Sequence, residues 1–245
     1  MKVIKPYFSF IDEEMGDKID GEKIFKRIEY LGRNCYKSEA KITNDSAWVF
    51  VEKGIKKKHE GLFEHIFISV RIICDRGVSH EIVRHRLVSY LQESTRYCNY
   101  LDENVGERIN MELIEKILDE GLIINDEIVK EDEGIVFIEP FFFRKKGRDL
   151  FYRIWKFAMK TCEFAYNSLI KLGAKPQEAR SVLPNSLKTD IIMTCNLRQW
   201  HYFLNLRTKK DCHPQVREIT IPLLKRFQEL IPLIFDDIIP DNLKF

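Results

Sequence analysis

The tripeptide Arg84-His85-Arg86 places three cationic side chains next to one another, with apolar residues on both sides. Fixed like charges repel each other and are costly to desolvate, so a fold that contains them must supply anions or leave them in water. Ser94, Arg96 and Tyr97 follow and add hydroxyls and a further guanidinium. Together these groups offer the bidentate, charge-assisted donors that suit phosphate. Taken alone, the cluster is better explained as a solvated basic face or an RNA-binding patch.

The overall charge limits which binding partners these cations can indicate. Forty Lys and Arg residues stand against 38 Asp and Glu residues, which leaves a net charge of +2. Such a chain has no bulk field that would draw it to nucleic acid or to a membrane surface. The cations therefore matter by position, and the sequence predicts neither a nucleic-acid nor a membrane partner.

The sequence also predicts a cytoplasmic setting. The first residues contain no long apolar run and soon turn acidic, which argues against a signal peptide. No stretch approaches the apolar length of a membrane span. The six cysteines are scattered without a C-x-x-C pair, so we expect neither a zinc site nor a redox site, but buried thiols in a reducing compartment.

The first half of the chain contains two helical patterns and one strand pattern. Residues 21–32 and the apolar stretch 47–51 favour helices. From His65 to Cys74 apolar residues alternate with period two, which predicts a strand. Gly77 is expected to end this strand, and Ser79 is expected to cap a helix that leads to the basic cluster.

The second half is more regular. Residues 111–118 favour a short helix, whereas segment 121–147 is compatible with either a hairpin or an insertion. Apolar residues at helical spacing predict a long helix from Leu150 to Leu169, which ends at Gly173. Pro176 is suited to begin the next helix.

A final strand and helix complete the pattern. Residues 189–195 favour a strand, and Asn196 can cap a helix that runs to Arg207. Helices and strands interleave without a strict βαβ rhythm or an internal repeat. We therefore predict a mixed α/β fold, with one compact domain over residues 1–245 and a central sheet flanked by helices.

One acidic and histidine-rich segment could suggest a metal site. His59-Glu60 and Glu64-His65 do not match H-E-x-x-H, whose histidines lie four apart on one helix face. Gly61 also argues against a continuous helix. A polar turn is the better interpretation, and the sequence predicts no metal.

The remaining polar residues have ordinary explanations when each is taken alone. Arg180 is most simply an exposed helix arginine. Asn196, Arg198 and Asn205 fit the polar stripe of an amphipathic helix. That explanation suits Arg207 less well, because Arg207 lies on the terminal turn, where a side chain can point at a ligand.

Five motifs in order resemble the flavin-dependent (alternative) thymidylate synthases. The element R-H-R-x7-S, from Arg84 to Ser94, is that family's signature, and weaker similarity extends from Arg33 to Ser38. Ordered agreement of five motifs is far more specific than agreement of one. The motifs are His59-Glu60-x-x-Phe63-Glu64-His65, Arg84-His85-Arg86-x7-Ser94-x-Arg96-Tyr97, Ala179-Arg180-x-x-Leu183-Pro184, Asn196-x-Arg198 and Phe203-Leu204-Asn205-Leu206-Arg207.

The resemblance implies a reaction, its cosubstrates and an assembly. It implies methyl transfer to dUMP to make dTMP, with 5,10-methylenetetrahydrofolate as carbon donor, NADPH as reductant and FAD as hydride carrier. It also implies the fold of that family and a homotetramer whose active sites are shared between subunits. No catalytic cysteine is needed.

The resemblance also assigns residues by position. Arg207 matches the arginine that favours the N3-ionised uracil, a catalytic role that suits a fixed guanidinium beside developing negative charge. The implied FAD contacts are His59, Gly61 through its backbone, Arg84, His85, Arg86, Gln92, Asn196, Arg198 and Tyr202. The implied dUMP contacts are Glu81, Ile82, Val83, Arg84, Gln92, Ser94, Arg96, Arg180 and Arg207.

This chain departs from the family pattern at three places in the site. Gly61 stands where the family often has Thr. His80-Glu81 replaces the frequent Arg-Gln before the signature, and Tyr202 stands where Asn or His is usual. Two other classes stay open: a nucleic-acid-binding protein, which the balanced charge disfavours, and a flavoprotein of the same fold that has lost methyl transfer.

Overall fold

The computed structural model describes residues 1–101, 109–120, 124, 128–130 and 133–241. The chain divides into two compact units. Both combine helices with strands, so the predicted mixed α/β class is confirmed, whereas a single domain over residues 1–245 stays a prediction. Unit 1 comprises Met1–Pro6, Ile73–His80 and Gln92–Ile191, and unit 2 comprises Tyr7–Ile72, Glu81–Leu91 and Ile192–Phe245.

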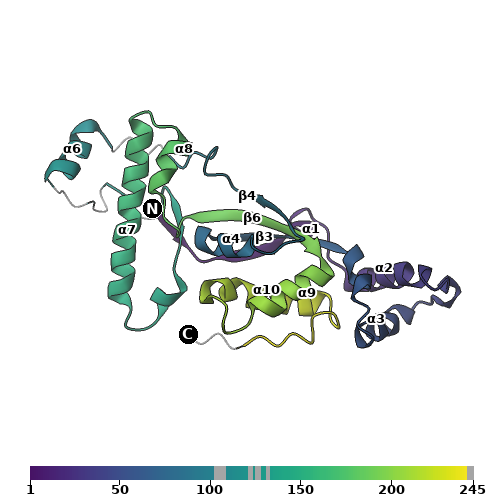
Figure 1. Cartoon of the computed structure of the whole chain (residues 1–245). Helices are drawn as coiled ribbons and strands as arrows, with labels where there is room; N and C mark the ends of the chain where they lie inside the picture. The colour runs from purple at the N-terminus through teal and green to yellow at the C-terminus, as the bar shows by residue number, and fades with distance from the viewer. Residues whose placement is uncertain (102–108, 121–123, 125–127, 131–132, 242–245) are drawn as a thin grey trace. The chain divides into compact units, whose positions relative to one another are not determined.

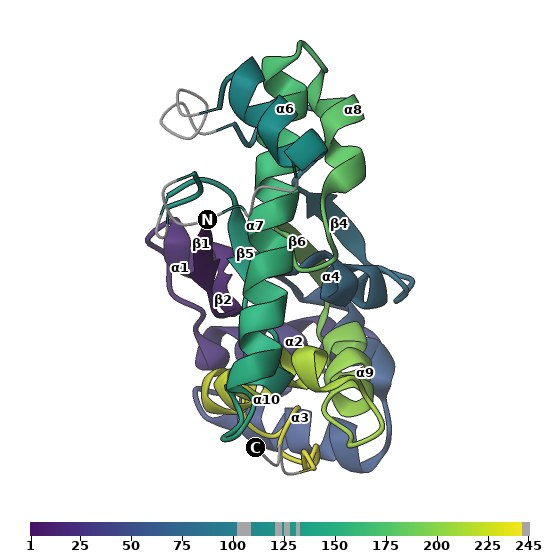
Figure 2. The same cartoon turned by 90° about the vertical axis from the view of Figure 1, so that its left-hand side faces the viewer.

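A long helix and a two-stranded sheet organise unit 1. β1 (Lys2–Ile4) and β5 (Val136–Ile138) pair in parallel and lie side by side in Figure 2. α7 (Asp149–Lys171) ends before Gly173, whose φ of +94° is a conformation that glycine adopts without strain. Unit 1 also contains α6 (Met111–Glu120), α8 (Pro176–Ala179) and 3-10 helices at Phe141–Arg144 and Arg180–Val182.

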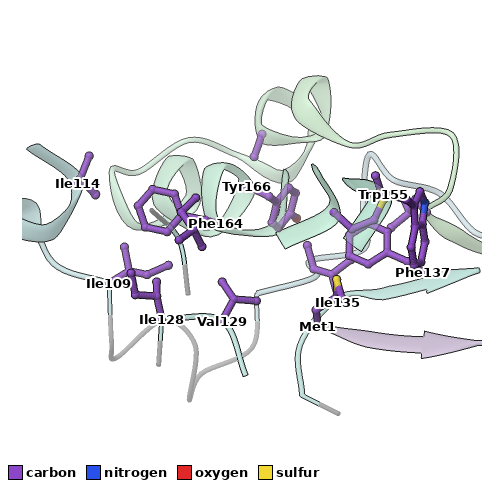
Figure 3. Packing of buried hydrophobic residues seen from close by; sticks show 14 residues of the cluster. Met1, Ile109, Ile114, Ile128, Val129, Ile135, Phe137, Trp155, Phe164 and Tyr166 are labelled. Atoms are coloured by element: carbon purple, nitrogen blue, oxygen red, sulfur yellow. The ribbon is translucent and has the colours of Figure 1, made fainter. Parts of the chain in front are cut away.

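The core of unit 1 joins α7 to β5. Phe137 of β5 is fully buried, and Trp155 of α7 lies next to it in Figure 3. Trp155 Nε1 donates to Ser186 Oγ at 3.0 Å, which satisfies the buried indole. Burying each such side chain stabilises the fold by about 1.5–3 kcal/mol.

Unit 2 contains α1 (Ile11–Glu14) and a pair of packed helices, α2 (Gly21–Asn34) and α3 (Ser46–Lys56). An added Cβ at Gly32 of α2 would lie 2.7 Å from the Phe50 ring of α3. Glycine therefore sets how closely these helices approach. Short 3-10 helices at Glu39–Lys41 and Glu60–His65 flank α3.

A second helix pair of unit 2 is α9 (Leu197–Arg207) and α10 (Pro214–Leu230), which lie side by side (Figure 1). Ring centroids of Trp200 and Phe227 are 5.2 Å apart, and those of Phe227 and Phe235 are 4.7 Å apart. Aromatic pairs at such separations contribute about 0.5–1.5 kcal/mol beyond their burial. This cluster fixes α9, whose last residue is Arg207.

Four strands form the larger sheet, in the order β2-β3-β6-β4. They are β2 (Tyr7–Phe10), β3 (Phe67–Asp75), β6 (Lys188–Asn196) and β4 (Ser89–Gln92), and the last three contribute residues to both units. Ile68, Val70 and Ile72 are at most 3% exposed, whereas Phe67 is 64% exposed. This alternation confirms the predicted strand over His65–Cys74.

The start of α4 (Arg76–Ile82) differs from the expectation. The prediction that Gly77 ends the strand and Ser79 caps the helix is wrong. Asp75 Oδ1 accepts from Val78 N at 2.8 Å and so has the capping role, whereas Ser79 lies buried inside the helix. The basic cluster follows the end of α4, as predicted.

The other predicted elements are confirmed. They correspond to α2, α3, α6, α7, α8, β6 and α9. Segment 121–147 lies partly outside the described residues, and its described part contains β5, which pairs with β1. Among the described residues, no helix is both long and apolar enough to cross a membrane.

Candidate active site

The junction at Asn196 sets the position of α9. Asn196 Oδ1 accepts a hydrogen bond from Gln199 N at 2.9 Å and caps the helix, as predicted. Trp200 Nε1 donates to Ile68 O of β3 at 3.0 Å, which fixes the rotation of α9 about its axis. Arg207, on the last turn, therefore has a defined place in unit 2.

One phenol anchors the turn that carries the basic cluster. The Tyr90 hydroxyl of β4 lies 2.8 Å from Ile82 O and 3.2 Å from His85 O. Burial raises the pKa of Tyr90, so the hydroxyl stays a donor at neutral pH. The anchored turn leaves Arg84 and Arg86 exposed and His85 buried.

Arg207 contacts this turn through three of its atoms. Its Nε donates to His85 Nε2 at 2.7 Å, and its Nη1 pairs with Glu81 Oε2 at 3.1 Å. Its Nη2 donates to the Glu81 carbonyl at 3.2 Å. The structure thus brings together three predicted site residues, although His85 and Glu81 lie 122 and 126 positions from Arg207 in the chain.

His85 is an acceptor here, and it is therefore neutral. A protonated imidazole has no lone pair to accept the Arg207 Nε–H. Burial, followed by the Arg207 charge, lowers the pKa of His85 to about 4. The expectation of three adjacent cations is therefore wrong at neutral pH. The physical cause is tertiary packing, since the Phe203 ring lies 4.8 Å from the imidazole.

A groove of about 1320 Å³ in unit 2 gathers much of the predicted site. α9 provides residues along it, and the segment after α4 and the 3-10 helix Glu60–His65 provide others. Phe63 and Phe67 add aromatic surface. Seven predicted residues line this groove: Arg84, His85, Arg86, Asn196, Arg198, Tyr202 and Arg207.

Two glutamates of the 3-10 helix Glu60–His65 neutralise one arginine of the groove. Arg198 Nη2 lies 3.0 Å from Glu60 Oε2, and Arg198 Nη1 bonds Glu64. In contrast, Arg84 and Arg86 have no acidic partner within the described part of the chain. The same part contains no group of three or more His, Cys, Asp or Glu residues that could hold a metal ion.

His59 and Gly61 lie at a different hollow of unit 2. This pocket of about 410 Å³ is formed by residues of α2, α3 and the segment 59–62. Tyr36 and Phe50 provide aromatic lining there. These two predicted FAD contacts therefore do not line the larger groove.

Unit 1 holds the other two predicted arginines, and each bonds a residue close in sequence to the other. Arg180 Nη1 donates to Thr95 Oγ1 at 3.2 Å, and Arg96 Nε donates to Gln177 Oε1 at 3.3 Å. Both arginines are exposed, and neither has an acidic partner among the residues described. The Ser94 hydroxyl lies 3.3 Å from Arg96 N. Two guanidiniums and a hydroxyl form a donor set that suits phosphate.

The remaining predicted contacts have defined surroundings. Gln92 Nε2 lies 2.9 Å from Ser79 Oγ and 3.1 Å from Thr189 Oγ1, which fixes its carboxamide in unit 1. In unit 2, Ile82 is 1% exposed and Val83 is 39% exposed. The Ile82 carbonyl already accepts from the Tyr90 hydroxyl, whereas Val83 has an accessible side chain.

Several residues of the groove were not identified from the sequence. His201 Nε2 lies 2.9 Å from Asp237 Oδ1, and both line the groove. Leu87 also lines it, 87% exposed and with φ of +62°. Phe67 carried no usable signal, because a single exposed apolar residue on a strand is common and does not mark a ligand surface.

Comparison with known proteins identifies a family for this sequence. The family model described as thymidylate synthase complementing protein matches residues 20–233. The flavin-dependent thymidylate synthase of Pyrococcus abyssi is 29% identical over 211 residues, covering 84% of this chain and 74% of that protein. That of Mycobacteroides abscessus is 28% identical, with 86% and 78% covered.

A solved structure has the same fold. The UMP/dUMP methylase PolB from Streptomyces cacaoi, bound with 5-Br dUMP, superposes with a TM-score of 0.67 at 17% identity, covering 96% of each chain. At this identity the likeness concerns the fold. Because the family model spans most of the chain, including every motif that carried the resemblance, the chain belongs to the thymidylate synthase complementing protein family.

Proposed function

We propose that the protein makes dTMP by methylating dUMP, with FAD as its bound cofactor. The groove of unit 2 carries this proposal, because it collects Arg84, Arg86, Tyr202 and Arg207 from motifs far apart in the chain. The family membership and the names of the relatives support the same activity.

The groove suits FAD in size, charge and lining. At about 1320 Å³ it exceeds the roughly 300–1,000 Å³ of most small-ligand pockets, which leaves room for a dinucleotide. Arg84 and Arg86 are exposed donors for a pyrophosphate, and Phe67 and Tyr202 offer accessible rings. When bound, FAD would supply hydride-carrying chemistry that no side chain provides. His85, Asn196 and Arg198 line the same groove and are further proposed contacts. His59, Gly61 and Gln92 do not line it and are proposed as FAD contacts on the family resemblance alone.

For dUMP, we assign the phosphate to the two exposed arginines of unit 1. Arg96 and Arg180 provide two guanidiniums, and Ser94 provides a hydroxyl. The segment Glu81–Arg84 and Gln92 are further proposed contacts of the nucleotide. Phosphate contacts of this kind hold the substrate equally well before and during reaction, so they set its affinity.

Arg207 is assigned to the uracil and has the catalytic role. Its guanidinium is held by His85 and Glu81 before any ligand arrives. A positioned cation stabilises the N3-ionised ring, which increases electron density at C5, where the methyl group is added. A preorganised contact of this type is worth about 2–4 kcal/mol in the transition state. The mechanism requires no cysteine nucleophile.

We further propose 5,10-methylenetetrahydrofolate and NADPH as cosubstrates, a cytoplasmic enzyme, and a homotetramer with shared active sites. One surface supports self-association. Leu150, Ile154 and Phe157 follow one face of α7 at helical spacing and are 63%, 61% and 54% exposed. An apolar stripe of this kind is typical of an interface between copies.

The proposal is tested on the purified protein by its flavin spectrum and by NADPH oxidation. We expect bound flavin, and oxidation that rises strongly when dUMP and the folate are supplied. A protein that takes up no FAD would contradict the cofactor assignment. Flavin without any response to dUMP would instead favour the flavoprotein that has lost methyl transfer.

A further inference from the structure

The hydrogen bonds of Arg207 leave little of its guanidinium free. An arginine carries five N–H donors. The Nε–H donates to His85, the two Nη1 donors face Glu81 Oε2 and Cys212 Sγ, and one Nη2 donor meets the Glu81 carbonyl. Among the described residues, this leaves one Nη2 N–H without a protein acceptor. Arg207 lines the groove, so that donor is the one available to a ligand.

Glu81 accepts two of the hydrogen bonds that Arg207 donates. Its carboxylate and its carbonyl accept from the two terminal nitrogens of the same guanidinium. The backbone contact is independent of residue type, but the carboxylate contact is specific to Glu81. With His85 on the Nε side, Glu81 closes a brace that fixes the plane of the guanidinium.

We infer that Glu81 is a positioning residue that acts on the reaction only through Arg207. This inference rests on the proposed function. A guanidinium that is free to rotate would have to be ordered as charge develops, whereas a braced one has no such cost. The Glu81 side chain therefore serves turnover rather than dUMP binding, although the family resemblance implies that Glu81 contacts dUMP.

A double-mutant cycle separates these two roles, because residues that act through one another are not additive. We expect Glu81→Ala to lower kcat about tenfold, the loss typical of one hydrogen bond to a charged group, with little change in the KM for dUMP. In an Arg207→Ala background, Glu81→Ala should change kcat by less than about twofold. Glu81→Gln keeps an oxygen acceptor and should recover most of the activity.

The chain offers a matched control. Glu13 pairs with Arg226 at 3.0 Å and is 38% exposed, as Glu81 is in its pair with Arg207 at 3.1 Å. Glu13 does not line the groove. Glu13→Ala should therefore lower neither kcat nor flavin content, and thermal unfolding of all variants identifies any general loss of folding.

The possible results distinguish a failure of the inference on Glu81 from a failure of the proposed function. An equal loss of kcat in the wild-type and Arg207→Ala backgrounds would overturn the inference, because Glu81 would then act on the ligand directly. Wild-type activity in both Glu81→Ala and Glu81→Gln would also overturn it. If the wild-type protein shows no dUMP chemistry, the proposed function fails. A crystal structure of Glu81→Ala then tests the brace alone, which an unmoved Arg207 guanidinium would refute.

Discussion

At the scale of single residues, the site depends on groups whose character comes from their neighbours. His85 stands in a basic tripeptide, yet burial makes it a neutral acceptor for Arg207. Arg207 stands on an ordinary helix, yet Glu81 and His85 hold it as a fixed donor. The motif identifies these residues, and the fold assigns their charge states.

The first prediction compares Arg207 with Arg180. Arg207→Ala should lower turnover by roughly two to three orders of magnitude with FAD retained, because the contact is made to charge that develops in the reaction. Arg180→Ala should mainly raise the dUMP concentration required. Arg207→Lys should recover little, since a point charge does not replace a planar fork. Steady-state kinetics with varied dUMP measure both effects, and near-normal turnover of Arg207→Ala would remove it from the catalytic role.

The second prediction concerns pH. The pKa of His85 is lowered from 6.5 to about 4 in the folded chain, so below pH 6.5 the unfolded state binds a proton that the folded state refuses. Above pH 6.5 His85 is neutral in both states and costs the folded state no stability. As the pH falls from 6.5 toward 4, the unfolded state gains a proton and the stability of the folded state decreases. We expect the free energy of unfolding to decrease across this window. Denaturation of His85→Gln, whose side-chain oxygen can still accept from Arg207, should show a shallower decrease.

At the scale of elements, local pattern predicts what local forces determine. The strand from His65 and the cap at Asn196 are confirmed, because alternation and capping act over a few residues. The predicted start of α4 is wrong because the Asp75 side chain, rather than that of Ser79, caps the helix. α10 was not identified at all, and Pro222 inside it interrupts the usual helical signal.

The site shows the same limit. The sequence motifs identify Arg84, Arg86 and Arg207, which line one groove. They do not reveal that the Glu81 side chain binds Arg207, because 126 positions separate the two residues and only the packing of α9 brings them together.

The third prediction tests the contact between α2 and α3. A glycine-to-alanine change inside a helix normally stabilises it by about 0.5–1 kcal/mol. At Gly32 the added Cβ would lie 2.7 Å from Phe50 and 2.8 Å from Leu62, so overpacking of about 1–3 kcal/mol should prevail. Gly61→Ala is the control, since nothing lies within 4 Å of its added Cβ. Equal stability of the two variants in urea would contradict this packing.

At the scale of the whole molecule, we propose several ligands and a self-associated protein. The exposed face of α7 at Leu150, Ile154 and Phe157 gives one protomer an apolar surface that a second copy can cover. If active sites are shared between copies, assembly and turnover must be lost together.

The fourth prediction tests this surface. Ile154→Glu with Phe157→Glu should shift the assembly toward monomers in light scattering, because two buried charges without partners are costly. Turnover should fall with it. Leu172→Glu is the control, because Leu172 is 56% exposed but follows the end of α7. A monomeric and fully active double variant would refute the shared site.

The most direct test of the proposed function is transfer of labelled carbon. The purified protein is incubated with dUMP, NADPH and 5,10-methylenetetrahydrofolate labelled at the methylene carbon, with Arg207→Ala as a parallel sample. We predict labelled dTMP from the wild-type protein, formed only when FAD and NADPH are present, and a roughly hundredfold lower yield from the variant. A flavin-loaded wild-type protein that oxidises NADPH but forms no labelled dTMP would contradict the assignment.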